Sequence, residues 1–156
     1  MKGAERITAM QARNLAKAAM RAWESKDVIV LASLLADNFF CRGLLPQPVQ
    51  KMQYLDFMQA IMTAMPDWLF HDYFLDEGPV TEQGERMFFV TQITGTHTGD
   101  LILPDLPIIP PTGAIISLPY RHLEYFVKEE TITTITGDFS PNALAEILAQ
   151  MGIVLP

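Results

Sequence analysis

Cysteine and histidine are scarce in this chain of 156 residues, which contains one cysteine and three histidines. The lone Cys41 cannot form an internal disulfide, and so few thiols and imidazoles argue against a zinc site of the finger type. The spacing of His71, His97 and His122 does not indicate a metal triad, so no metal site is expected. Folding must then depend on packing, and 49% apolar residues suffice for the core of a single domain over residues 1–156.

Long apolar runs and basic clusters are also lacking. No run approaches the roughly 18 consecutive apolar residues of a membrane span, and residues 1–6 lack the apolar stretch of a secretion signal. Residues 1–71 contain eight Lys or Arg against six Asp or Glu, whereas residues 72–156 contain three against twelve, which together give the net charge of -7. We therefore expect a cytoplasmic protein with no membrane and no nucleic acid as partner.

Three helices are predicted in the first half of the chain. Thr8 and Gln11 have the spacing of a capping box, so a helix should begin directly after Thr8. Asp27 can cap a second, shorter helix, and a third helix fits residues 51–65 with Pro66 as its stop. The third helix should turn an apolar face to the interior, formed by Tyr54, Met58, Ile61 and Met65, and turn Gln53, Asp56 and Thr63 away from it.

After Pro66 the periodicity changes to that of β-strands bounded by turn-forming residues. The predicted strands are Phe39–Arg42, Trp68–Asp76, Arg86–Thr96, Ile115–Val127 and Thr131–Asp138, with turns at 77–79, 99–113 and 128–130. Strands joined by short turns should pair antiparallel, and a last short helix fits Asn142–Met151. The fold class is therefore α+β.

The segment 99–113 is the most unusual part of the chain. It holds four prolines and six Leu or Ile, which is too apolar to remain in water and too rich in proline for an inner strand. A lid over a pocket mouth and a dimer contact are both consistent with this composition.

The order of these elements resembles that of the NTF2-like (cystatin-like) α+β cone, in which three N-terminal helices pack on a highly curved, mainly antiparallel sheet that encloses a pocket. Several strings resemble the SnoaL-like polyketide cyclase branch of that superfamily and recur in family order over nearly the whole chain. They are Leu34-Leu35-Ala36-Asp37-Asn38-Phe39-Phe40, Ala64-Met65-Pro66-Asp67, Thr94-Gly95-Thr96-His97-Thr98-Gly99 with Pro110-Pro111-Thr112-Gly113, and Leu148-Ala149-Gln150-Met151-Gly152.

The resemblance implies a small, mostly hydrophobic ligand inside the cone, a homodimer formed through the sheet, and no metal or organic cofactor. It also implies that Asp138 is the acid and base of an intramolecular aldol condensation, with His122 beside it. The chain departs from the branch at Thr133–Thr136, where an acidic-aromatic string is usual, at Arg42, often a pocket histidine, and in its longer 99–113 loop. A changed ligand or a lost reaction would explain these departures.

Strand alternation suggests how such a catalytic set could form. Tyr120, His122 and Glu124 share one strand face, and antiparallel pairing through the turn at 128–130 would bring Asp138 close to them. If that face lines the cone, a carboxylate base, an imidazole partner and a phenol as oxyanion donor would suit proton abstraction next to a carbonyl group. Asp138 as a turn cap and His122 as a half-buried partner of Glu124 are the structural alternatives.

Other residues are candidates for contact with the ligand, although aromatic residues and methionine at periodic positions are more often core. His97, in a turn rich in Gly and Thr, suits a loop-fixing role better than catalysis. The predicted ligand-binding residues are Trp23, Phe40, Arg42, Tyr54, Met58, Trp68, His97 and Glu124.

Two functions follow from this interpretation. The first is a cofactor-independent cyclase or isomerase that acts by acid-base, aldol-type chemistry on a small hydrophobic carbonyl compound. The alternative is a module of the same fold that binds a small hydrophobic ligand, or dimerises, without chemistry. Edge strands and the apolar loop also favour a homodimer.

Overall fold

The computed structural model describes residues 8–153, so residues 1–7, where the sequence predicts no secretion signal, and 154–156 lie outside the described part. Its helices are α1 (Ala9–Glu24), α2 (Val28–Leu34), α3 (Lys51–Ala64) and α4 (Ala143–Gln150). Its strands are β1 (Leu35–Arg42), β2 (Val49–Gln50), β3 (Asp72–Thr81), β4 (Gly84–Thr91), β5 (Thr94–Thr96), β6 (Ile115–Ser117), β7 (Arg121–Lys128) and β8 (Thr131–Gly137). The predicted α+β class, with three helices before the main strands, is confirmed.

The helix starts follow from local capping. Gln11 donates its backbone N–H to Thr8 Oγ1 at 3.1 Å, and the Thr8 backbone N–H donates to Gln11 Oε1 at 2.8 Å, which completes the predicted capping box. The carboxylate of Asp27 accepts the Val30 N–H at 3.0 Å and caps α2. Pro66 follows closely on the end of α3, as predicted.

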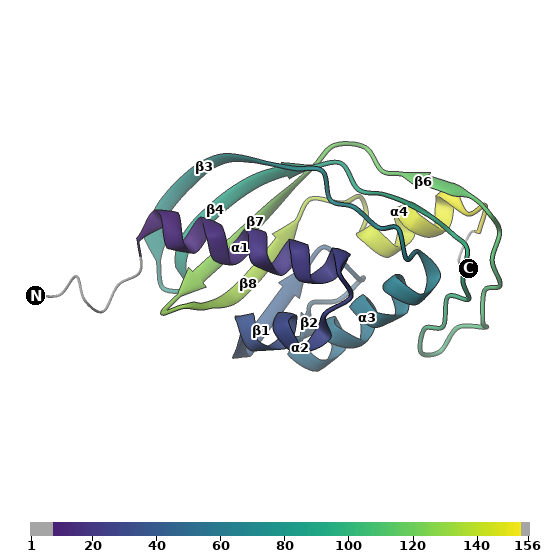
Figure 1. The fold of residues 1–156 in the computed structure, drawn as a ribbon, viewed down its shortest axis with the longest axis horizontal. Helices are drawn as coiled ribbons and strands as arrows, with labels where there is room; N and C mark the ends of the chain where they lie inside the picture. The colour runs from purple at the N-terminus through teal and green to yellow at the C-terminus, as the bar shows by residue number, and fades with distance from the viewer. Residues whose placement is uncertain (1–7, 154–156) are drawn as a thin grey trace, which may run out of the picture.

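The main sheet has six strands in the order β2-β1-β8-β7-β4-β3, and β5 pairs with β6 in a separate ribbon. All pairs within the six-stranded sheet are antiparallel except β1 with β8, which makes the sheet mixed. The sheet curls over α1, and α2 and α3 lie along its lower rim (Figure 1). The helices thus cover the concave side of the sheet.

The strand boundaries differ from the prediction in several places. β3 begins at Asp72 rather than at Trp68, and the predicted strand Arg86–Thr96 is broken into β4 and β5. β1 begins at Leu35 rather than at Phe39. β3 runs through the predicted turn at 77–79 as far as Thr81, because Gly78-Pro79 is accommodated by a register shift on an edge strand, where a proline leaves no ladder bond unmade. The predicted strand Ile115–Val127 is broken before β7, so it forms β6 and β7.

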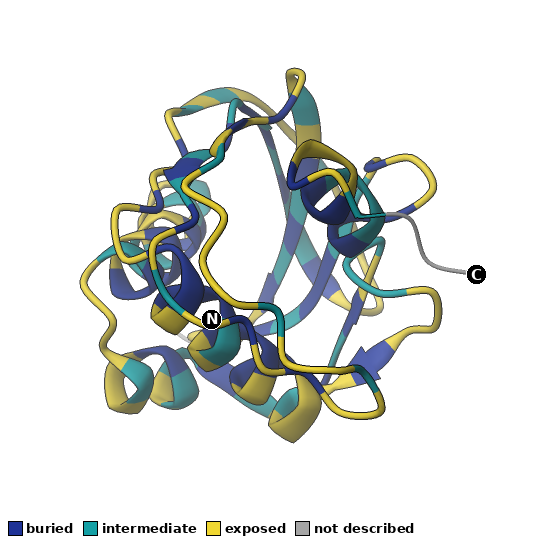
Figure 2. Ribbon diagram, turned by 90° about the vertical axis from the view of Figure 1, so that its right-hand side faces the viewer, coloured by how far each residue is buried: buried dark blue, intermediate teal, exposed yellow. Residues whose placement is uncertain are grey.

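The core lies between the helices and the concave face of the sheet. Ala12, Ala16 and Ala19 form a stripe of small residues on α1 and are at most 1% exposed, which lets the helix approach the sheet closely. The inner faces of helices and strands are buried and their outer faces exposed (Figure 2). Among the described residues, no helix is long and apolar enough to cross a membrane.

Candidate functional site

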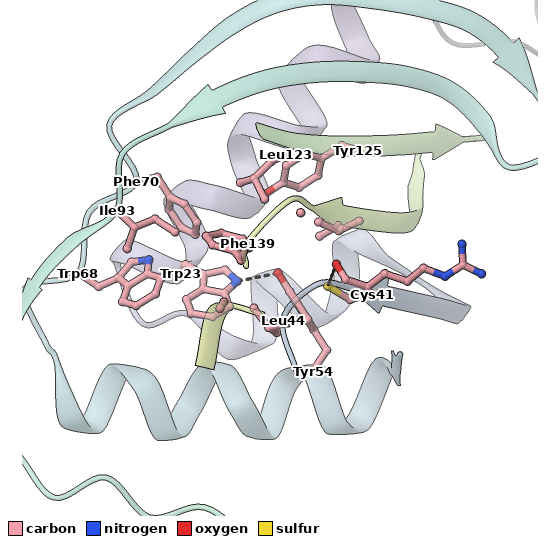
Figure 3. Close-up of a pocket in the computed structure, with 14 residues that line it drawn as sticks. Trp23, Cys41, Leu44, Tyr54, Trp68, Phe70, Ile93, Leu123, Tyr125 and Phe139 are labelled. Carbon is pink, nitrogen blue, oxygen red and sulfur yellow. Dashed lines mark hydrogen bonds between the residues drawn. The ribbon is translucent and has the colours of Figure 1, made fainter. Parts of the chain in front are cut away.

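A small cavity lies in the middle of the cone, surrounded by aromatic side chains (Figure 3). Its volume is about 30 Å³, which is enough for a water molecule but far below the roughly 150 Å³ that holds a benzene ring. Trp23 stacks on Trp68 with ring centroids 5.3 Å apart, and Phe70 meets both rings edge to face. The other lining residues are Cys41, Arg42, Leu44, Tyr54, Ile93, Leu123, Tyr125, Ile135, Gly137, Phe139 and Ala143.

Apart from Arg42, the polar side chains that line this cavity are neutral hydrogen-bonding groups. The indole N–H of Trp23 donates to Tyr54 Oη at 2.8 Å, whereas the buried indole N–H of Trp68 has no hydrogen-bond partner among residues 8–153. Burial raises the pKa of the Cys41 thiol to about 12 and also raises the pKa values of Tyr54 and Tyr125. Because no Asp, Glu or His of the described part of the chain lines the central cavity, its described lining offers no carboxylate or imidazole base for proton abstraction.

His122 and Asp138 do meet, as the strand register predicts. His122 Nδ1 lies 2.8 Å from Asp138 Oδ2, and the His122 backbone N–H donates to Asp138 Oδ1 at 2.7 Å. Burial alone would raise the pKa of Asp138, but the hydrogen bonds from His122 and the charges of His122 and Arg121 outweigh it and lower that pKa. The pair is therefore a carboxylate and an imidazole held in a fixed orientation.

The position of this pair corrects the expectation that its strand face lines the cone. Leu123, Tyr125 and Val127 are the buried residues of β7 and face the helices, so His122 turns to the outer side of the sheet. The His122 and Asp138 side chains are 46% and 52% exposed. The physical reason is that a strand packed on one side only must place its uninterrupted apolar set toward the core.

The other polar candidates of β7 also lie on the outer side. The His122 ring stacks on the Phe88 ring, with the ring centroids 5.2 Å apart. The guanidinium carbon of Arg86 also lies over the Phe88 ring, 4.6 Å from its centroid. The Glu124 carboxylate forms an ion pair with the Arg86 guanidinium rather than with His122. Tyr120 is 61% exposed and precedes β7, so it is not held against the pair.

A second concave site is a groove of about 640 Å³, which we call the lid groove. It lies between α3, the 99–113 segment and the start of α4, at the end of the molecule where these three elements meet (Figure 1). Its lining is mostly apolar, with two polar residues on α3. The lining residues are Leu45, Gln53, Asp56, Phe57, Ala60, Ile102, Leu103, Pro104, Leu106 and Leu144.

The lid groove and the central cavity share a wall. Leu44 and Ala143 line the cavity, and their chain neighbours Leu45 and Leu144 line the groove. The Leu144 N–H donates to the Leu44 carbonyl oxygen at 3.0 Å, which holds the start of α4 against this segment. The cavity and the groove are therefore adjacent.

The 99–113 segment is fixed at both ends. The Thr98 and Gly99 N–H groups both donate to the Ala64 carbonyl oxygen at 3.0 Å, at the end of α3. At the other end the Thr112 N–H donates to His97 Nδ1 at 3.2 Å, which is the loop-fixing role expected for His97. The segment is thus a roof of the lid groove, and its roles as a lid and as a dimer contact both stay predictions.

The predicted ligand-binding residues divide into two groups. Trp23, Arg42, Tyr54 and Trp68 line the central cavity. The other four do not: Met58 and His97 are buried elsewhere, Phe40 stacks under the Arg42 guanidinium at 5.0 Å, and Glu124 is on the outer face. A role in ligand binding stays a prediction for all eight.

Sequence reasoning did not identify the α3 residues of the lid groove. Gln53 and Asp56, which were expected to turn away from the interior, recur with Phe57 and Ala60 at the spacing of a helical stripe. The sequence feature that could have indicated the groove is the apolar pair Phe57 and Ala60, which lies next to the polar pair Gln53 and Asp56 on α3. Together with the apolar 99–113 segment, that stripe indicates a second contact surface on α3.

No protein-family model matches the chain, and a search of curated proteins gives no match. Solved structures do match it over most of its length. AclR from Streptomyces galilaeus, a proposed hydroxylase, aligns with a TM-score of 0.67 at 15% identity, over 96% of this chain and 89% of AclR.

Two proposed polyketide cyclases are similar to the chain in the same way. A SnoaL-like one from Jannaschia sp. CCS1 aligns with a TM-score of 0.66 at 13% identity, over 93% of this chain and 94% of that one. IdmH from Streptomyces antibioticus aligns with a TM-score of 0.63 at 18% identity, over 92% of this chain and 99% of IdmH. At such identities the likeness concerns the fold.

Proposed function

We propose that this chain, which has the NTF2-like fold of the SnoaL-like polyketide cyclases, binds a small hydrophobic compound in the lid groove. The observation that carries the proposal is the groove itself, about 640 Å³ in volume with eight apolar and two polar lining residues. Sites for small molecules have volumes of about 300–1,000 Å³ and a mostly apolar lining with a few polar groups. The central cavity, at about 30 Å³, is too small for this purpose.

The test is a fluorescence titration with the apolar probe N-phenyl-1-naphthylamine. Ala60→Phe adds a ring to the floor of the groove, so the probe should bind about tenfold more weakly than to the wild type because the ring takes up its space. Gln59→Phe is the matched control, since it adds the same side chain on the next residue of α3, outside the groove. It should change the affinity less than about twofold.

Two results would contradict this proposal. One is a wild-type protein that leaves the probe fluorescence unchanged and carries no retained small molecule in native mass spectrometry after purification. The other is equal weakening by Ala60→Phe and Gln59→Phe. Far-UV circular dichroism of both variants shows whether each keeps the helix content of the wild type.

A second candidate function is supported by the hydrogen-bonded His122–Asp138 pair. It is a cofactor-independent cyclase or isomerase in which Asp138 takes a proton from the carbon next to a carbonyl group, leaving an enolate. His122 would orient Asp138, and Tyr120 would have to turn toward the pair in order to donate to the enolate oxygen. Since this pair lies on the outer face of the sheet, the carbonyl compound would have to bind there.

Deuterium exchange into 2-tetralone, a small hydrophobic ketone with acidic C–H groups, tests this second function. In D2O the wild-type protein should accelerate the exchange, and Asp138→Asn should lose about 100-fold of that acceleration because it lacks the base. Asp76→Asn, on the exposed edge strand β3, is the control and should exchange like the wild type. Exchange equally fast in Asp138→Asn and wild type would reject the acid-base role.

A further inference from the structure

Asp56 is the one charged side chain among the residues that line the lid groove. It forms no hydrogen bond and no ion pair with any residue between 8 and 153. On α3 it lies three residues after Gln53 and four before Ala60, so the helix presents all three to the same groove. The carboxylate is therefore available to a group that enters the groove from solvent.

Gln53 is the second polar residue of the groove, and its orientation is fixed. Its side-chain oxygen accepts the Gln50 N–H at 3.0 Å, at the start of α3. The Gln53 side-chain oxygen thus already accepts a hydrogen bond from the start of α3. The Asp56 carboxylate is the side-chain acceptor of the groove that accepts no hydrogen bond from residues 8–153. This leaves a carboxylate beside apolar walls formed by the 99–113 segment and the start of α4.

The charge of the surroundings selects the sign of the ligand. No Lys or Arg between residues 8 and 153 lines the groove, so Asp56 carries the only charge of its described lining. An anionic ligand would meet the Asp56 charge with no cation to offset it, whereas a cationic group would gain a partner. The apolar walls, in turn, suit a hydrocarbon or aromatic body.

We infer that the lid groove takes an amphiphilic cation, a compound with an apolar body and a protonated amine, and that Asp56 is its counter-ion. This inference rests on the proposed function, because it assigns a ligand class to the same groove. It is a statement about recognition, since the Asp56 carboxylate pairs with the amine without a covalent step. It is separate from any role of the outer-face pair.

Three ligands with one body test the inference: 4-phenylbutylamine, 4-phenylbutanol and 4-phenylbutyrate, measured by isothermal titration calorimetry. The amine should bind about two- to fivefold more tightly than the alcohol, as expected for one solvent-accessible ion pair, and the acid should bind most weakly. Asp56→Asn should abolish the preference for the amine and leave the affinity for the alcohol unchanged. The preference of the wild type should also decrease as salt is added.

Asp100→Asn is the matched control, because it removes the same charge from the 99–113 segment outside the groove lining. It should keep the wild-type preference for the amine. If all three ligands bind and Asp56→Asn keeps that preference, the amine assignment is wrong while the groove remains a ligand site. If none of the three binds and Ala60→Phe leaves N-phenyl-1-naphthylamine binding unchanged, the proposed function itself fails.

Discussion

At the scale of single residues, the hydrogen bond between Trp23 and Tyr54 joins α1 to α3 inside the cone. Both side chains are buried, at 2% and 4% exposure, and the Trp23 N–H donates to Tyr54 Oη at 2.8 Å. A buried donor that loses its acceptor costs more than the bond contributes, because it keeps its desolvation penalty. This pair is therefore more important for stability than its single bond indicates.

Tyr54→Phe removes only the acceptor and should lower the free energy of unfolding by about 1–3 kcal/mol. Urea unfolding followed by circular dichroism measures this as a lower midpoint at unchanged slope. The control is Tyr73→Phe, since Tyr73 is 62% exposed and its hydroxyl group should contribute less than about 0.5 kcal/mol. An unchanged midpoint for Tyr54→Phe would show that water replaces the bond.

The His122–Asp138 pair predicts a pH dependence of stability. The folded protein holds the pKa of Asp138 below its ordinary value of 3.8, so Asp138 stabilises the fold above that value. The contribution is lost as the pH falls through the lowered pKa, where the carboxyl group takes up a proton. It is small, because about half of the Asp138 side chain is exposed.

Unfolding midpoints of the wild type and of Asp138→Asn, compared between about pH 6 and about pH 3, measure this linkage. The wild type should be the more stable protein near pH 6, and the difference should shrink toward pH 3. A difference that stays constant over this range would mean that the Asp138 charge does not contribute. Asp76→Asn serves again as the exposed control.

At the scale of elements, the close contact of the 99–113 segment with α3 depends on Gly99. A Cβ atom on residue 99 would lie 2.1 Å from the Thr63 carbonyl oxygen, which is far inside any allowed contact. The Gly99 N–H also donates to the Ala64 carbonyl oxygen at 3.0 Å. The end of α3 and the start of the lid thus approach each other backbone to backbone.

Gly99→Ala should therefore displace the start of the lid from α3 while the rest of the fold remains. Hydrogen exchange should become faster at the amides of residues 98 and 99, and probe binding in the lid groove should weaken because its roof has moved. The control is Asp100→Ala, since Asp100 is the exposed residue that follows Gly99. It should change neither the hydrogen exchange of residues 98 and 99 nor probe binding. Unchanged exchange in Gly99→Ala would show that the contact is not close in solution.

At the scale of the whole molecule, the outer face of the sheet is left uncovered by α1, α2 and α3 (Figure 1). Cross-strand partners Tyr73 and Val90 lie beside His122 on this face, and Tyr73 is 62% exposed. Phe88 and Phe126 add apolar surface to it, since neither belongs to the buried core. Exposed apolar patches of this kind mark surfaces that bind other proteins.

We predict a homodimer formed through this face. Sedimentation equilibrium at micromolar concentration should give twice the monomer mass of 17.5 kDa. Tyr73→Asp and Val90→Asp each place a charge in the interface and should both shift the protein to the monomer. Ile29→Asp, on the 79% exposed position of α2, is the control and should leave the dimer intact. A wild type that sediments as a monomer would refute the prediction.

The sequence by itself determined the local structure and the fold. Capping by Thr8 and Asp27, the stop at Pro66 and the alternation of β7 depend on neighbours along the chain, so they could be predicted residue by residue. The register that pairs His122 with Asp138 also followed, because a tight turn joins their strands. The ends of several strands were misjudged. β3, for example, runs on to Thr81, since an edge strand tolerates Gly78-Pro79.

Only the tertiary structure decided which of these residues face a ligand. Alternation divides β7 into two sets, but the packing of α1 selects Leu123, Tyr125 and Val127 for the interior and leaves His122 outside. The lid groove arises only where α3, the 99–113 segment and α4 meet, so Asp56 could not be recognised on α3 alone. A site built from distant segments depends on how their surfaces pack, and this information is not contained in the periodicity of any one segment.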